Sequence, residues 1–149
     1  MMQTGTDGVV RYATLVVLSL ALSLVFLSIA VVIAMASRRK SRAFGVSLLV
    51  WFFFVIFYDL LALGITLFLR GPWANAFLFL SLFANPVDLV RVASLIVLDN
   101  VTIFGTAGAA LLRFFGGAAT SIFLLAVGIV LWVLLPFLWS TRLLRRQDI

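Results

Sequence analysis

The chain has 149 residues, of which 65% are hydrophobic and only 11% are charged, and its formal net charge is +6. A soluble domain usually carries about 25% charged residues, so this composition excludes a water-soluble globular protein and predicts a single transmembrane domain over residues 1–149. Cysteine and histidine are absent, which excludes disulfides, zinc sites, thiol catalysis and histidine-dependent triads within this chain. No metal and no cofactor is therefore expected.

Three long apolar runs predict transmembrane helices, over about residues 13–36, 43–69 and 117–139. Each run is longer than the roughly 18 residues that mark a helix able to cross a membrane. The first and third runs are uncharged, whereas the second contains one carboxylate, Asp59. The expected fold is an all-α membrane protein with three transmembrane helices.

Most of the basic residues flank these spans and predict how the chain is oriented. They lie between the first and second spans and just after the third: Arg38, Arg39, Lys40, Arg42, Arg142, Arg145 and Arg146. The positive-inside rule places both segments in the cytoplasm. An even number of crossings must then separate them, so we expect an integral protein of the inner or plasma membrane with its N-terminus outside and its C-terminus cytoplasmic.

The segment between the second and third spans contains two shorter apolar stretches, Trp73–Ala84 and Pro86–Leu98. Each would be a helix about 18–20 Å long, which is too short to cross the membrane. Short apolar helices joined by a breaker are typical of a re-entrant hairpin, which a membrane tolerates where its backbone is buried against protein. We expect an external re-entrant helical hairpin over about residues 71–104.

The junction of this hairpin reads ANPVDLVR and has the pattern of a helix start. Asn85 is a favoured N-cap residue, Pro86 suits the first helical position, and Asp88 falls where its carboxylate can reach back to the N–H of the cap. Arg91 follows three residues later and is placed to pair with Asp88. Capping explains these residue types, and a transport role for Asp88 or Arg91 is the alternative.

Asp59 lies about 24 Å into its span, in the outer third of the bilayer. An ionisable residue at that depth usually faces the protein interior or a wet cavity, so it is a candidate functional residue. The alternative is a structural ion pair, with Arg91 or Arg113 as the partner. A Tyr58-Asp59 pair is also found in intramembrane aspartyl proteases, but those need a second catalytic Asp after a GxG turn, and Asp88 follows NPV. No catalytic residue is predicted.

The order of these features resembles that of a known family. A span ends in SRRKSRAFG, an aromatic span reads LLVWFFFVIFYDLLALG, a broken hairpin carries NPVDLVRV, and the last span ends in TRLLRRQDI. This layout resembles the C-terminal half of permeases of the type-2 ABC transporter family, and it is most similar to the branch that serves nitrous-oxide reductase maturation. The tail departs from the family pattern because Gln147 separates Arg146 from Asp148.

The resemblance implies a half-permease of an ATP-driven transporter, in which the three spans correspond to the fourth, fifth and sixth spans of a complete permease. It implies three protein partners: an ABC ATP-binding subunit, a polypeptide supplying the other permease half, and a second permease in a dimer. The chain has no GxxxxGK[ST] loop, so ATP hydrolysis is expected in the separate subunit. The alternative function is a small integral-membrane assembly or scaffold subunit without a transport role.

Composition limits what such a permease would carry and bind. A copper pathway needs soft or imidazole ligands, and this chain offers only Met1, Met2 and Met35. A non-metal cargo or a mechanical role is therefore expected. Membrane lipid is a further expected partner, whereas nucleic acid is not, because topology and anionic lipid account for the basic clusters.

Overall fold

The computed structural model describes residues 5–37, 39–69, 71–98 and 116–145, and every regular element in these ranges is helical. The expected all-α fold is therefore confirmed for the described part of the chain. The elements, in chain order, are α1 (Gly5–Ala36), α2 (Lys40–Phe52), the π-helix η1 (Phe53–Phe57), α3 (Tyr58–Phe68), α4 (Pro72–Ala84), α5 (Pro86–Val97) and α7 (Ala118–Arg145).

Three helical stretches within the described residues are long and apolar enough to cross a membrane: Gly8–Ala36, Lys40–Phe68 and Ala119–Arg142. They confirm that the three expected runs form helices that are candidate membrane spans. The helices extend past the apolar runs because a membrane limits hydrophobic length and not helix length. α1 thus begins before Arg11, and α7 continues through Pro136 and past Trp139.

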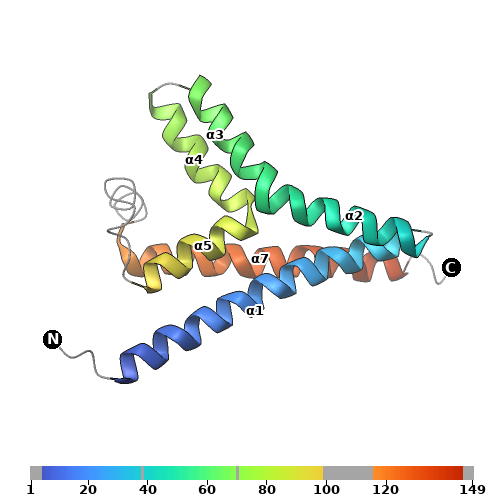
Figure 1. Ribbon diagram of the computed structural model, residues 1–149, viewed down its shortest axis with the longest axis horizontal. Coiled ribbons are helices and arrows are strands. Elements are labelled where there is room, and N and C mark those ends of the chain that lie inside the picture. The colour runs from blue at the N-terminus through green and yellow to red at the C-terminus, as the bar shows by residue number, and fades with distance from the viewer. Residues whose placement is uncertain (1–4, 38, 70, 99–115, 146–149) are drawn as a thin grey trace.

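Figure 1 shows that α1 and α7 lie side by side and run in the same direction. The end of α1, the start of α2 and the end of α7 meet at one end of the molecule, and the start of α1 lies at the other. The helix ends that carry the basic residues therefore lie at the same end of the molecule. An even number of membrane crossings between them requires this. Which side of the membrane that end faces stays a prediction.

The protein core forms where α5 packs against α1 and α7. Its buried members are Leu82, Leu89, Val90, Ala93, Leu125 and Ile129. Gly128 of α7 allows the close approach of the hairpin, because a Cβ there would lie 3.1 Å from Leu89 Cδ1 and 3.2 Å from Phe83 Cδ1. The hairpin is thus held by apolar packing against two of the three spans.

The second span, by contrast, has no buried residue along α2, η1 or α3. Large apolar side chains cover its surface, and Phe68 is 88% exposed. A surface of this kind is stable only in hydrocarbon or against another apolar surface. The second span therefore has most of its surface available for lipid or for a partner protein.

The expected hairpin between the second and third spans corresponds to α4 and α5, which are consecutive helices broken at Asn85. α4 packs against α3, and α5 then departs along α7 (Figure 1). The two short helices are therefore confirmed, while their re-entrant position in a membrane stays a prediction. Positions 99–104 of the expected hairpin lie outside the described residues.

Candidate functional site

The break between α4 and α5 centres on Asn85, which has an extended backbone and no exposed surface. Its side-chain Oδ1 accepts a hydrogen bond from the backbone N–H of Val87 at 3.0 Å, and Pro86 occupies the first helical position. Both groups act as a helix N-terminus requires, since the first N–H groups of a helix have no partner within it. The predicted capping role of Asn85 is confirmed.

The last turn of α4 leaves backbone carbonyls that also need partners from outside the helix. The hydroxyl of Tyr58 donates to the carbonyl of Ser81 at 2.8 Å, and the indole Nε1 of Trp132 donates to the carbonyl of Phe83 at 2.9 Å. Tyr58 belongs to the second span and Trp132 to the third. Two spans therefore satisfy the end of the short helix.

The side-chain amide of Asn85 links the break to the second span. Its Nδ2 donates to the carbonyl of Phe54 at 3.1 Å and to Asp88 Oδ2 at 3.1 Å. Phe54 lies in η1, where the N–H of Tyr58 bonds back five residues to the carbonyl of Phe53. A π-helical turn interrupts the regular α-helical ladder and is often found at functional sites. Here its carbonyl receives a donor from a neighbouring helix.

Asp88 therefore reaches back to the cap as the sequence predicted, but with a different partner. The expectation was a bond to the backbone N–H of Asn85, and the structure instead gives a bond to the Asn85 side chain. The reason is that the amide of Asn85 is turned between Phe54 and Asp88, so it presents a donor to the carboxylate. Sequence spacing fixes which residues can meet but not which atoms do so.

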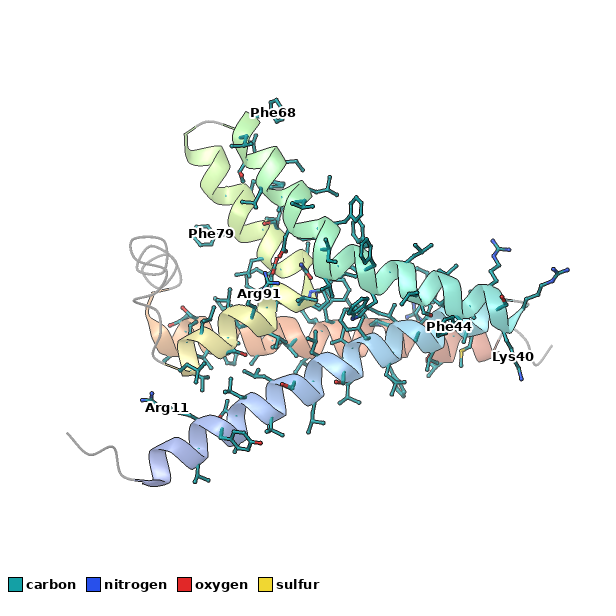
Figure 2. All side chains as sticks on the ribbon, in the orientation of Figure 1. Arg11, Lys40, Phe44, Phe68, Phe79 and Arg91 are labelled. Carbon is teal, nitrogen blue, oxygen red and sulfur yellow. The ribbon has the colours of Figure 1, made fainter. Side chains whose placement is uncertain are left out.

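Arg91 joins the two carboxylates. Its Nη1 donates to Asp59 Oδ2 at 2.8 Å and to Asp88 Oδ1 at 2.9 Å. Figure 2 labels Arg91 beside the junction of the hairpin and the second span. The pairing of Arg91 with Asp88 is confirmed, and the structure pairs Asp59 with Arg91, one of the two partners considered for it. Arg113, the other candidate, lies outside the described residues.

This Asp59–Arg91–Asp88 cluster has one positive and two negative formal charges, and it is only partly shielded from solvent. The side chains of Asp59, Asp88 and Arg91 are 30%, 19% and 48% exposed. Burial, with a further contribution from the charge of Asp59, raises the pKa of Asp88 in α5 to about 6. Asp88 therefore binds a proton more readily than an isolated carboxylate does.

The arrangement can hold helices together, and Asp88 within it can exchange a proton. Within the described ranges, no three His, Cys, Asp or Glu side chains gather where they would bind a metal ion. At the helix break, the Tyr58 hydroxyl and the Asn85 amide donate hydrogen bonds to backbone carbonyls. These hydrogen bonds and ion pairs connect the second span to the hairpin.

Sequence reasoning missed three contributors to this site: Tyr58, Trp132 and the carbonyl of Phe54. A signal existed for two of them, because a buried Tyr hydroxyl or Trp N–H in an apolar region usually finds an acceptor. The π-helix had no signal, since FFVIF reads as part of a continuous apolar run. The acceptors themselves are backbone atoms, which no residue type marks.

Two curated proteins are similar to part of this chain. The "Probable ABC transporter permease protein NosY" of Pseudomonas aeruginosa is 39% identical over 77 residues, and that of Stutzerimonas stutzeri is 36% identical over 77 residues. Each match covers 52% of this chain but only 28% of the relative. No family model and no solved structure matches. The resemblance to an ABC transporter permease is thus confirmed, as a similarity that spans about half of this chain and just over a quarter of each permease.

Proposed function

We propose that this chain is a membrane-spanning half-permease of an ATP-driven ABC transporter, of the branch that serves nitrous-oxide reductase maturation. The observation that carries the proposal is the 39% identity over 77 residues to the probable ABC transporter permease protein NosY of Pseudomonas aeruginosa, in a chain with three candidate spans. ATP hydrolysis would belong to a separate ATP-binding subunit. A second polypeptide would supply the other half of the permease, and two permeases would form a dimer.

The hydrogen bonds at the helix break support a hairpin that enters the membrane from its outer side. Asn85 bonds to Phe54, which lies at the midpoint of the 29-residue second span. Backbone at that depth must have its polar groups satisfied by protein, and Tyr58, Trp132 and Asn85 supply partners at the break. These bonds are what a re-entrant hairpin requires.

A scaffold or assembly subunit is the second candidate function, and one observation favours it. Arg91 already pairs with both Asp59 and Asp88, so these charges have a structural role without any cargo. A pure scaffold would need only packing and this ion pairing. A permease would need the cluster to bind cargo, open a path or change its pairing during the transport cycle.

Co-purification separates the two candidates. The full chain, affinity-tagged and solubilised gently from its native membrane, should bring with it an ABC ATP-binding subunit and a second polypeptide with about three spans. Mass spectrometry would identify both. Recovery of the intact chain without any ATP-binding subunit would contradict the proposal.

Asp59→Asn tests whether the cluster takes part in transport. We expect the variant to assemble with its partners but to lose most ATP-dependent activity, because it keeps the size of the side chain and removes the charge that pairs with Arg91. Thr66→Val is the control, since among the described residues the Thr66 hydroxyl bonds to the carbonyl of Leu63 in its own helix. Normal activity of Asp59→Asn would assign Asp59 to the scaffold.

A further inference from the structure

Two apolar grooves adjoin the C-terminal half of α1. The first has a volume of about 240 Å³ and lies between α1 and α2, where its lining includes Phe26, Ile29, Phe44, Leu48 and Trp51. The second has a volume of about 300 Å³ and lies between α1 and α7. Ile29 lines both grooves, so they are neighbours on one face of α1.

The groove between α1 and α7 is lined entirely by apolar side chains. It is lined by Ile29, Val32, Ile33, Trp132, Leu135, Pro136 and Trp139. From Trp132 to Trp139 the helix rises about 10 Å, which is a third of a hydrocarbon core about 30 Å thick. A groove of this length matches part of an acyl chain that lies parallel to the helices.

A basic residue lies within one helical turn of the lining residues of each groove. Lys40 and Arg142 are exposed, and Figure 2 shows Lys40 near Phe44 at the end where α1, α2 and α7 meet. Lys40 precedes the lining residue Phe44 by four positions, and Arg142 follows the lining residue Trp139 by three. These spacings place each cation on the groove side of its helix.

We propose that this end of the molecule binds one anionic phospholipid, with its acyl chains in the two grooves and its phosphate held by Lys40 and Arg142. Charge complementarity selects this occupant, because basic pockets between membrane helices attract anionic head groups. A partner helix would fill an apolar groove but would not require cations at its mouth. The proposal depends on the candidate spans and not on a transport activity.

Contact quenching of tryptophan fluorescence tests the site. The chain has four tryptophans, and Trp73→Phe leaves Trp51, Trp132 and Trp139, all of which line the grooves. The full-length variant would be reconstituted in unlabelled phosphatidylcholine. Phosphatidylglycerol or phosphatidylcholine with brominated acyl chains would then be added in increasing amounts.

Brominated phosphatidylglycerol should reach half-maximal quenching at a mole fraction roughly 30-fold below that of brominated phosphatidylcholine, as two cations near an anionic lipid predict. In the same background, Arg142→Gln should reduce this preference roughly fivefold, and the double variant Lys40→Gln/Arg142→Gln should abolish it. Val32→Phe should lower quenching by both lipids, because it fills the groove between α1 and α7.

Arg42→Gln is the matched control. Arg42 lies at the same end but shares the opposite side of α2 with Val46 and Leu49, as helical spacing requires, so its loss should leave the lipid preference unchanged. Equal quenching by the two lipids would overturn the proposal. So would a preference that Arg42→Gln removes as strongly as the double variant does, since that would show attraction to the whole basic surface. Circular dichroism would confirm that each variant is folded.

Discussion

Asn85 is the residue on which both sides of the helix break depend. Its oxygen caps α5 through the N–H of Val87, and its amide donates to Phe54 and Asp88. A wholly buried side chain with three such bonds cannot be replaced by an apolar one without leaving buried polar groups unpaired.

Asn85→Leu should therefore lower the free energy of unfolding in detergent by about 2–4 kcal/mol, from the lost cap and the unpaired carbonyl. Thermal unfolding followed by circular dichroism would measure the change. Ser94→Ala is the control on the same helix, because the Ser94 hydroxyl bonds, within the part of the chain that the structure describes, to the carbonyl of Val90 of its own helix. An Asn85→Leu variant as stable as Ser94→Ala would show that the break is held by packing alone.

Asp88 makes stability depend on pH. Its pKa in the folded chain is raised to about 6 from the ordinary value of 3.8, by burial and then by the charge of Asp59, against the opposing effect of Arg91. A raised pKa means that the folded state binds the proton more tightly than the unfolded state, so stability falls as pH rises through about 6. The charged groups that face it are Asp59 and Arg91.

We expect the melting temperature in detergent to rise as the pH is lowered from about 7 to about 5, and Asp88→Asn to remove most of that rise. Asp59 faces the same guanidinium, so Asp59→Asn should weaken the dependence by removing the neighbouring charge. A wild-type melting temperature that falls over this range, or one that Asp88→Asn leaves unchanged in its slope, would contradict the assignment.

At the scale of the element, the end of α4 depends on residues from other helices. Tyr58 and Trp132 supply the donors for its carbonyls of Ser81 and Phe83. Trp132 also packs against Phe54, with ring centroids 5.4 Å apart in an edge-to-face arrangement. A short helix is marginal by itself, so these contacts with two spans explain how α4 can end inside an apolar region.

Trp132→Phe should cost about 1–3 kcal/mol, because it keeps an aromatic ring but leaves the carbonyl of Phe83 without this donor. Trp139→Phe is the matched control, since Trp139 is 65% exposed and makes no comparable bond in the described structure. Thermal unfolding of both variants in the same detergent gives the comparison. Equal stabilities would mean that the indole N–H does not support the break.

At the scale of the whole molecule, the shared end of the two basic segments predicts a single orientation. The chain lacks cysteine, so an introduced cysteine is a unique label site. Gly8→Cys should react with a membrane-impermeant maleimide in intact cells, and Ser41→Cys should react only after the cells are opened, because the positive-inside rule places Ser41 in the cytoplasm. Labelling of Ser41→Cys alone in intact cells would reverse the orientation.

Much of the fold could be predicted because the membrane imposes a simple rule on composition. A long apolar run in a membrane must become a helix that satisfies its own backbone, so the runs around Asp59 and Pro136 were predicted as helices, and both are confirmed as candidate spans. The pattern around Asn85 predicted the start of α5 for a similarly local reason. The pairing of Arg91 with Asp88 also follows from spacing on one helix.

The rest of the site depends on which helices pack together. The sequence allowed either Arg91 or Arg113 as the partner of Asp59, and packing of the hairpin against the second span brings Arg91 to it. The same packing brings the carbonyls of Phe54, Ser81 and Phe83 to their donors. Local composition determines helices, ends and membrane affinity by itself, because those follow from neighbours along the chain. Contacts between residues more than twenty positions apart arise only when helices assemble, since no local pattern records which carbonyl will face which side chain.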